Sequence, residues 1–340
     1  MLYRLYRPKT FSDIEGQEHV IRTLQGALAS ERIGHAYFFA GPRGTGKTTM
    51  ARVFAKALNC TARKKEEPCN ACFSCQEINA GKSIDLIEID AASNRGIDEI
   101  RALKESAGVA ASSSRYKIFI VDEVHMLTPP AFNALLKTLE EPPAHIVFML
   151  ATTEPHKVPE TILSRVQRLD FKKITGAQIL KKLKSIADAE KLTVDDASLE
   201  LIAAGAGGSL RDAESALSKV MAYTGKKITV ADVSAILGIL PLESHRELLH
   251  LIKEKQQAAA IAHIGALYES GVQMEQFAKQ FIDFVRMVLL KEVGHPGTDP
   301  GLTPPVLVAI LQRLMQARNE LKHSPIPQLP LELALIDLTS

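Results

Sequence analysis

The octapeptide Gly41-Pro42-Arg43-Gly44-Thr45-Gly46-Lys47-Thr48 reads G-x-x-x-x-G-K-T. An apolar run with strand character, 36–40, precedes it, and a helical pattern, 49–58, follows it. A strand, a glycine-rich turn and a helix in this order are the setting of a P-loop, whose backbone N–H groups surround a phosphate chain at a helix N-terminus. Lys47 is expected to reach the β- and γ-phosphates, and the Thr48 hydroxyl to hold Mg²⁺. A chance match is the alternative, and the flanking strand and helix oppose it.

Length and charge set broad limits. The 340 residues give room for two or three domains. The formal net charge is +2, from 41 Lys and Arg against 39 Asp and Glu, which excludes a strongly basic chain but not a local basic face. No apolar run approaches the roughly 18 residues that cross a membrane, and residues 1–8 lack the apolar region of a signal peptide. The sequence therefore predicts a cytoplasmic protein that does not enter a membrane.

All four cysteines fall in one short segment with the spacing C-x8-C-x2-C-x2-C. Cys60, Cys69, Cys72 and Cys75 suit a tetrahedral thiolate cage for Zn²⁺ in a module of about residues 60–80. Because four thiolates leave no position for water, this zinc site is expected to be structural. Four unrelated thiols are the alternative.

Three further runs predict strands: the run at 83–90, which alternates between apolar and polar residues, and the continuous apolar runs at 116–121 and 145–151, which predict buried strands. Asp122 and Glu123 follow the second run, where ligands bind in open α/β sheets, and this placement indicates a Walker B pair. Asp122 would support Mg²⁺, and Glu123 would orient or deprotonate the attacking water. A strand that ends in Asp-Glu is common by itself, but the P-loop upstream makes the assignment specific. Thr152 and Thr153 follow the third run, where a hydroxyl could contact the γ-phosphate or the water.

The second half of the chain reads differently. Strand–helix alternation up to about residue 172 predicts an α/β parallel sheet, whereas no strand is expected after residue 175. Helices are predicted from there to the end, with Ser209 as the N-cap of a helix at 210–223 and a Gly/Pro-rich loop at 294–305. Arg211 lies in the first turn of its helix, where a cation opposes the helix dipole, and this weakly indicates an anionic partner.

A series of short motifs runs in order along almost the whole chain. They are Y-R-P-K-T-F, G-Q-E-H-V, the P-loop, the four cysteines, D-A-A-S-N, D-E-V-H-M-L, F-N-A-L-L-K-T-L-E-E-P-P, A-T-T-E-P, I-L-S-R and G-S-L-R-D-A. Together they resemble the gamma/tau subunits of bacterial DNA polymerase III clamp loaders, a family of AAA+ ATPases. The P-loop and Walker B pair are generic to many NTPases, whereas the F-N-A-L-L-K run, the S-R pair and the cysteine insertion are specific to clamp loaders.

This resemblance implies a fold and an activity. The fold would be α/β plus all-α: an AAA+ P-loop parallel-sheet domain at 1–172 with a zinc-binding insertion, a small helical lid at 173–240 and a C-terminal helical collar for oligomerisation at 241–340. The activity would be ATP hydrolysis by a subunit of the DNA-directed DNA polymerase III holoenzyme that does not itself carry the polymerase active site. ATP, Mg²⁺ and Zn²⁺ would be bound.

The resemblance also assigns roles to residues. Thr152 would be sensor 1, Arg211 would be sensor 2 on the lid, and Arg165 would be an arginine finger for the nucleotide of a neighbouring subunit. The catalytic set is then Lys47, Asp122, Glu123, Thr152, Arg165 and Arg211. The nucleotide-binding set is Tyr6, Arg7, Pro8, Ile14, Gly16, Gly41, Gly44, Thr45, Gly46, Lys47, Thr48, Thr49 and Arg211, with the first five beside the adenine. On pattern alone, those five could equally belong to a packing arm.

The implied partners are delta, delta-prime and further gamma/tau copies in a five-subunit ring, the sliding clamp, and primer-template DNA contacted through its phosphates. ATP binding and hydrolysis would load the clamp onto primed DNA during replication. Arg95, Arg101 and Lys104 are candidate DNA contacts, although a solvated helix face explains them equally well. Two departures from the family are Val166, where a Cys usually follows the S-R pair, and the end of the chain at Ser340, from which the polymerase- and helicase-binding segments of tau are expected to be missing.

Two other functions stay open from the sequence. A different AAA+ machine, such as a branch-migration motor, has a compatible domain order, but the cysteine insertion and third helical block oppose it. A ring scaffold that does not hydrolyse ATP would be expected to lack part of its Walker motifs, and here Lys47, Thr48, Asp122 and Glu123 are all present.

Overall fold

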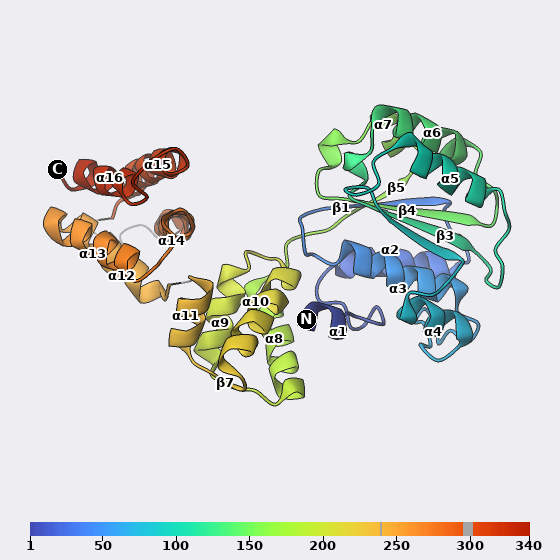
Figure 1. Ribbon diagram of the computed structural model, residues 1–340, viewed down its shortest axis with the longest axis horizontal. Coiled ribbons are helices and arrows are strands. Elements are labelled where there is room, and N and C mark those ends of the chain that lie inside the picture. Colours follow the sequence, from blue (N-terminus) through green and yellow to red (C-terminus); the bar gives the residue numbers. More distant parts are fainter. Residues whose placement is uncertain (239, 295–301) are drawn as a thin grey trace. The chain divides into compact units, whose positions relative to one another are not determined.

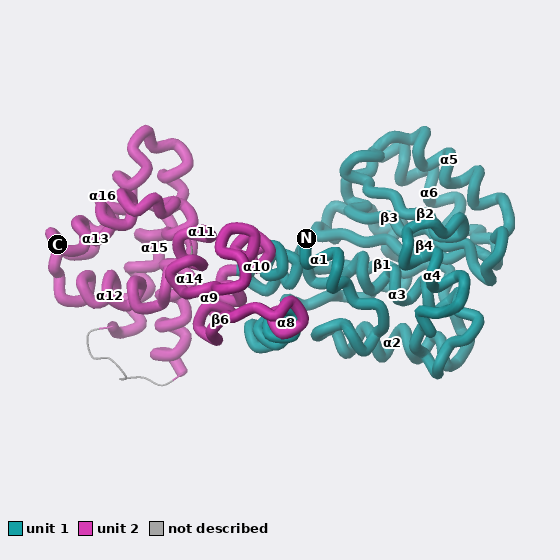
Figure 2. The backbone as a smooth tube through the Cα atoms, turned by 60° about the horizontal axis from the view of Figure 1, so that its bottom comes forward, with its two compact units in different colours: residues 1–186, 206–215 teal, residues 187–205, 216–340 magenta. Residues whose placement is uncertain are grey.

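The computed structural model describes residues 1–238, 240–294 and 302–340. The chain divides into two compact units, which Figure 2 distinguishes by colour. The first comprises residues 1–186 and 206–215, and the second comprises residues 187–205 and 216–340. The expected three-domain division at residues 172 and 240 stays a prediction, and most of the predicted loop at 294–305 lies outside the described residues.

A five-stranded, fully parallel sheet forms the centre of the first unit (Figure 1). Its strands are β1 (Ala36–Ala40), β2 (Leu86–Asp90), β3 (Lys117–Asp122), β4 (Ile146–Thr152) and β5 (Gln167–Asp170). They follow the order β2-β3-β4-β1-β5, so β1 and β3 both pair with β4. Strands β1, β3 and β4 are apolar on both faces because helices cover both faces of the sheet. This confirms the predicted α/β parallel sheet.

Two hydrophobic clusters show how the strands divide their side chains between the faces. Tyr37 and Phe39 pack with α2 (Glu18–Ala29) and α3 (Lys47–Asn59), whereas Phe38 and Ala40 pack with α5 (Ile97–Ala107) and α6 (Pro129–Glu140). Successive side chains of a strand point to opposite faces, so the all-apolar β1 supplies both cores. The short elements of this unit are α1 (Leu2–Leu5), α4 (Phe73–Ala80), η1 (Val124–Met126), η2 (Pro155–Lys157) and α7 (Glu160–Leu163).

Four helices follow the sheet in the chain: α8 (Gly176–Glu190), α9 (Asp196–Gly205), α10 (Leu210–Thr224) and α11 (Val230–Leu237). Ser209 caps α10 as predicted, because its Oγ accepts a hydrogen bond from the N–H of Asp212 at 3.2 Å. The expectation that no strand follows residue 175 is wrong. A two-stranded parallel pair, β6 (Thr193–Val194) and β7 (Lys227–Ile228), lies within the second unit. Two-residue strands carry no periodic signal, and tertiary packing alone brings them together.

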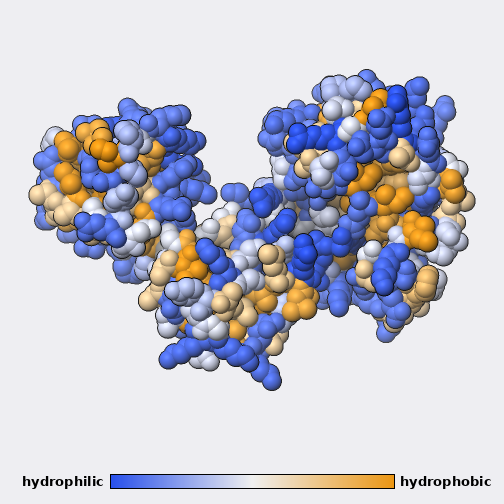
Figure 3. All heavy atoms as spheres, viewed as in Figure 1, coloured by the Kyte–Doolittle hydropathy of each residue, from blue (hydrophilic) through white to orange (hydrophobic). Residues whose placement is uncertain are grey.

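The C-terminal helices pack as a bundle of α12 (Leu242–Lys253), α13 (Gln257–Glu269), α14 (Met274–Gly294), α15 (Pro304–Leu321) and α16 (Leu329–Thr339). Phe277, Phe281 and Phe284 of α14 are buried in its core, as their spacing predicts. His245 of α12 stacks on Phe277 with ring centroids 5.7 Å apart, and burial lowers the pKa of this imidazole. Apolar residues also gather on the visible surface of the bundle (Figure 3). Within the described residues, no helix combines the length and the hydropathy needed to span a membrane.

Candidate functional site

The glycine-rich loop joins the end of β1 to the start of α3, and its glycines are required by close packing. Gly41, Gly44 and Gly46 have φ values of 150°, 73° and 97°. A Cβ atom on Gly41 would lie 2.5 Å from the carbonyl oxygen of Phe171, and one on Gly44 would collide with the Ser209 side chain. The loop therefore packs directly against the segment after β5 and the start of α10, and only glycine fits at these two positions.

Lys47, the first residue of α3, turns its side chain back over the loop. Its Nζ donates hydrogen bonds to the carbonyl oxygens of Gly41 and Pro42 at 2.8 and 2.9 Å. Burial lowers the pKa of the Lys47 ammonium, and the nearby Glu123 and Asp122 carboxylates oppose that shift. The Thr45 hydroxyl also donates to the Pro42 carbonyl, at 2.8 Å. The loop thus holds one cation and a helix N-terminus at the same place, which suits an anionic ligand.

The predicted Walker B carboxylates lie beside the P-loop. The Thr48 hydroxyl donates to Oδ2 of Asp122 at 2.6 Å, although the two residues are 74 positions apart in the chain. Hydroxyl and carboxylate oxygens are the ligand types that Mg²⁺ takes from proteins, so this pair fits the ion. Glu123 adopts a left-handed conformation with φ of 47°, and its Oε2 accepts hydrogen bonds from the Thr153 N–H and hydroxyl at 3.1 and 2.9 Å.

Thr152 and Thr153 therefore occupy different places. The Thr152 side chain is fully buried, and its Oγ1 lies 2.9 Å from Nδ1 of His125 and accepts a hydrogen bond from the Glu154 N–H at 3.0 Å. Thr153, not Thr152, contacts the Glu123 carboxylate. Nδ1 of His125 also lies 3.4 Å from Oε2 of Glu123, so this histidine joins Thr152 to the Walker B pair.

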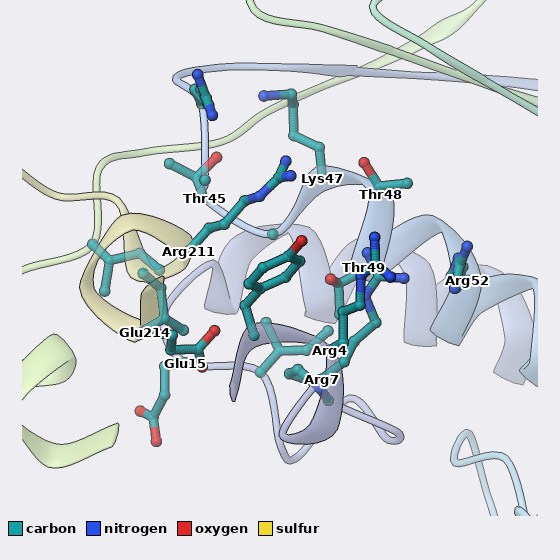
Figure 4. Close-up of a pocket in the computed structure, with 18 of the residues that line it drawn as sticks. Arg4, Arg7, Glu15, Thr45, Lys47, Thr48, Thr49, Arg52, Arg211 and Glu214 are labelled. Carbon is teal, nitrogen blue, oxygen red and sulfur yellow. The ribbon is translucent and has the colours of Figure 1, made fainter. Parts of the chain in front are cut away.

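A cavity of about 550 Å³ opens over the P-loop, within the size range of small-molecule sites. Six cations and four carboxylates line it among the described residues, a balance that favours a polyanion. Arg4, Thr49 and Arg52 lie on one side in Figure 4, and Glu15 and Glu214 on the other. The full lining is Tyr3, Arg4, Arg7, Pro8, Ile14, Glu15, Arg43, Gly44, Thr45, Gly46, Lys47, Thr48, Thr49, Arg52, Asp122, Glu123, Ile174, Leu210, Arg211 and Glu214.

Most of the predicted nucleotide residues thus share one cavity, including Arg7, Pro8 and Ile14 from the N-terminal segment and Arg211 from α10. The guanidinium of Arg211 lies over the ring of Tyr3, 5.0 Å from its centroid. Five residues of the predicted catalytic and nucleotide-binding sets do not line the cavity: Tyr6, Gly16, Gly41, Thr152 and Arg165.

The sequence interpretation did not identify several lining residues. Tyr3, Arg4 and Glu15 carry no recognisable pattern, and only the fold brings them to the cavity. Glu214 could have been found, because it lies three positions after Arg211 on the same helix and therefore on the same face. Its side chain is buried, its Oε1 has no hydrogen-bond partner, and burial raises the pKa of the carboxyl to about 7 against the opposing charges of Lys182 and Arg7.

Arg165 follows α7 and lies outside the cavity. Its Nη2 forms an ion pair with Oε1 of Glu140, the last residue of α6, at 2.9 Å. Its Nη1 donates to the Thr161 carbonyl at 2.7 Å and to the Ser164 hydroxyl at 3.0 Å. The side chain is 36% exposed, so its guanidinium is accessible from outside this chain.

The four cysteines converge, and all four are free thiols. Their sulfur atoms all lie within 4.8 Å of one another, and those of Cys60 and Cys72 are 3.9 Å apart. A tetrahedral zinc–thiolate site has sulfur–sulfur separations of about 3.8 Å, so the cluster is compatible with Zn²⁺. The sulfurs of Cys60 and Cys69 also accept hydrogen bonds from the N–H groups of Cys69 and Cys72, at 3.3 and 3.2 Å.

Three sequence families match consecutive parts of the chain. Residues 16–175 match "DNA polymerase III, delta subunit", residues 178–226 match "DNA polymerase III clamp loader subunit, ATPase lid domain", and residues 228–340 match "DNA polymerase III subunits gamma and tau domain III". Among solved structures, the RuvB Holliday junction branch migration motor of Thermotoga maritima is similar with a TM-score of 0.51 and 20% identity, over 76% of this chain and 85% of that one. At this identity the likeness shows the AAA+ fold alone.

Curated relatives are similar at higher identity. The chain is 46% identical to DNA polymerase III subunit tau of Bacillus subtilis, over 88% of this chain and 53% of that protein. It is 34% identical to DNA polymerase III subunit gamma of Buchnera aphidicola, over 100% of this chain and 98% of that protein. The chain therefore spans about half the length of the Bacillus protein and almost all of the Buchnera protein. On this similarity along its whole length, the chain belongs to the family of DNA polymerase III gamma/tau subunits.

Proposed function

We propose that this chain is an ATPase subunit of a bacterial DNA polymerase III clamp loader, in which ATP binding and hydrolysis drive the loading of the sliding clamp onto primed DNA. One observation carries the proposal. The P-loop residues Lys47 and Thr48 and the Walker B pair Asp122–Glu123 line one cationic cavity, in a chain of this family.

The residues around the cavity suit the phosphates of ATP. The N–H groups at the start of α3 and the Lys47 ammonium would hold the β- and γ-phosphates. Thr48 and Asp122 would hold Mg²⁺, which would neutralise phosphate charge when bound. Arg211, which lines the cavity from α10, would sense the far end of the phosphate chain. The proposed fit of the cysteines to Zn²⁺ gives that metal a structural role only, since four thiolates complete its shell.

Glu123 is the proposed general base. Its carboxylate lines the cavity and is oriented by two hydrogen bonds from Thr153. A carboxylate fixed in this way can accept the proton of a water molecule that attacks the γ-phosphate. Thr152 would act on the Glu123 carboxylate indirectly, through His125.

The proposed partners are delta, delta-prime and further gamma/tau copies in a five-subunit ring, together with the clamp and the phosphates of primer-template DNA. The C-terminal bundle supports assembly, because Met287, Leu290 and Val293 form a stripe along α14 with exposures of 52%, 55% and 59%. An exposed apolar stripe at helical spacing is typical of a protein–protein interface.

The test is the variant Glu123→Gln, which keeps the size of the side chain but cannot accept a proton. We expect ATP hydrolysis in the complex with clamp and primed DNA to fall by about 10²–10⁴-fold, with ATP affinity nearly unchanged. Glu160→Gln, at an exposed position on α7, is the matched control and should hydrolyse ATP normally.

Two results would count against the proposal. Wild-type chain that binds ATP but never hydrolyses it, even with clamp and primed DNA, would indicate the scaffold function instead. Hydrolysis that persists at the wild-type rate in Glu123→Gln would remove Glu123 from the mechanism. A branch-migration motor would unwind or migrate DNA without a clamp, and we expect no such activity.

A further inference from the structure

The cysteine module, residues 60–80, contacts the N-terminal segment 7–15 through a set of polar groups. The Glu67 carboxylate accepts two backbone hydrogen bonds, from the N–H of Phe11 to Oε2 at 2.8 Å and from the N–H of Ser12 to Oε1 at 3.0 Å. The Asn70 side-chain amide donates to the Lys9 carbonyl at 3.2 Å. Two residues of the module thus bind three backbone groups of a segment that lies more than 50 positions earlier in the chain.

Lys56 of α3 donates hydrogen bonds to both the N-terminal segment and the cysteine module. Its ammonium, on a side chain that is only 2% exposed, donates to the Lys9 carbonyl at 2.6 Å, to Oδ1 of Asn70 at 2.7 Å and to Oδ1 of Asn79 at 2.9 Å. One buried cation therefore joins the P-loop helix, the cysteine module and the N-terminal segment. Charge-assisted hydrogen bonds of this kind are stronger than neutral ones.

The position of Glu67 depends on the cysteines around it. Glu67 lies between Cys60 and Cys69, at the base of a tight hairpin whose backbone pairs Lys64 with Glu67 at 3.0 and 3.1 Å. Asn70 lies between Cys69 and Cys72 and has a positive φ of 57°. A metal that holds the four sulfurs together would also fix the hairpin and with it both contact residues.

The N-terminal segment forms one wall of the nucleotide cavity. Residues 9–12 contact the cysteine module. Arg7 and Pro8 line the cavity just before these residues, and Ile14 and Glu15 line it just after them. Between these two pairs, Phe11 is 1% exposed and packs into the core that includes Met50 and Phe54 of α3. This wall is therefore held by the buried Phe11 side chain and by the hydrogen bonds from Glu67 and Asn70, which together we call the brace.

We propose that the cysteine module positions this wall, with Glu67 as the main positioning residue, so that metal bound by the cysteines strengthens nucleotide binding. The inference rests on the proposed function, since it takes the cavity to be the ATP site. Without the Glu67 carboxylate, the amides of Phe11 and Ser12 lose their acceptor and the segment gains conformational freedom. Ordering it again on nucleotide binding reduces the affinity.

The experiment compares Glu67→Ala, Glu67→Gln and Glu66→Ala in the full chain. Glu66 is the matched control. It is the adjacent acidic residue, and its carboxylate forms no hydrogen bond or ion pair with residues 7–15, all of which the structure describes. The readouts are the Kd of a fluorescent non-hydrolysable ATP analogue and the amide hydrogen exchange of residues 9–12. For Glu67→Ala we expect about a tenfold rise in Kd and faster exchange of the Phe11 and Ser12 amides. Glu67→Gln should recover part of both, and KM should rise while kcat stays unchanged.

A second arm removes the metal with a chelator. Chelated wild-type chain should show the same rise in Kd and the same faster exchange at residues 9–12, and chelation of Glu67→Ala should add little to either. Non-additivity is expected because both changes act on the same brace.

The outcomes separate this inference from the proposed function. A Kd that stays unchanged in Glu67→Ala and in metal-free chain overturns it, as does a rise in Kd after chelation without faster exchange at residues 9–12. If the wild-type chain binds no ATP analogue, the proposed function fails. Exchange at residues 9–12 would then still show whether the module braces the segment.

Discussion

Glu214, a buried residue that lines the cavity, makes the stability of the native chain depend on pH. Its carboxyl is 5% exposed, and Oε1 has no hydrogen-bond partner. Burial raises its pKa from 4.5 to about 7, and the opposing charges of Lys182 and Arg7 reduce that shift only in part. The native chain therefore holds this proton more tightly than the unfolded chain between pH 4.5 and 7.

The buried Glu214 carboxyl destabilises the native state only at pH values where it is charged. Below about pH 4.5 the carboxyl is protonated in both states and costs nothing, whereas above about pH 7 it is charged and buried in the native state. The native state thus loses stability as pH rises through this range. Glu214→Gln has no ionisable group at this position. Its free energy of unfolding should therefore exceed that of wild type, and the difference should grow from pH 5 to pH 8 to on the order of 3 kcal/mol.

Urea unfolding of both proteins at several pH values measures this difference. Glu200→Gln, on an exposed face of α9, serves as the control and should show no such trend. A gap between Glu214→Gln and wild type that stays constant from pH 5 to pH 8 would show that Glu214 does not titrate in this range.

At the scale of single elements, α4 shows why the cysteines belong together. This helix has 8 residues, begins directly after Cys72 and carries Cys75 in its first turn. A helix of this length is not stable by itself in water. It packs on α3, and the proposed metal would anchor its N-terminal end.

We therefore expect one Zn²⁺ per chain and four thiols that become reactive only after the metal is removed. Chelation should lower the Tm by about 2–4 °C for each kcal/mol of stabilisation lost, with the amides of α4 among the first to exchange. Elemental analysis and thiol titration check the stoichiometry. A Cys72→Ser variant, which lacks one ligand, should respond much less to the chelator.

A metal content far below one equivalent per chain, together with four freely titratable thiols, would contradict the expected zinc site. The cysteines would then be unrelated thiols, which was the alternative that their spacing left open.

At the scale of the whole molecule, the cavity lacks one cation that the family resemblance predicts. Arg165 does not line the cavity of its own chain, and its guanidinium pairs with Glu140 at the end of α6. An exposed arginine in such a place can act on a neighbouring subunit's nucleotide. A single chain would then bind ATP well and hydrolyse it slowly.

Arg165→Ala tests this in the reconstituted complex. ATP affinity should stay within about twofold, whereas DNA-stimulated hydrolysis should fall by about 10³-fold if the arginine acts as a full finger. The slow hydrolysis by the isolated chain should not change, because there Arg165 has no neighbouring site to reach. Arg168→Ala is the matched control, since Arg168 is also exposed and paired, with Asp170 at 2.8 Å.

Hydrolysis at the wild-type rate in complexes that contain Arg165→Ala would exclude the in-trans role. An equal loss in the isolated chain and in the complex would place the effect within one subunit. Val166, the departure from the family pattern, is partly buried and packs against the hydrophobic cluster that includes residues of α5 and α6.

The amino-acid sequence determined the features that depend on neighbours in the chain. The runs at 36–40, 83–90, 116–121 and 145–151 predicted β1, β2, β3 and β4, the P-loop glycines predicted the turn into α3, and Ser209 predicted the start of α10. The cysteine spacing predicted a cluster that the structure brings together. These features are local, because periodicity, caps and glycine conformations act over a few residues.

The tertiary structure decided the distances and contacts between groups that lie far apart in the chain. The Thr48–Asp122 hydrogen bond, the contact of Glu123 with Thr153, the β6–β7 pair and the brace from Glu67 to the N-terminal segment all join residues far apart in the chain. The strand order and helix packing set these distances, and a one-dimensional pattern does not contain them. Tyr3, Arg4 and Glu15 line the cavity for the same reason, because packing of distant elements brings them there.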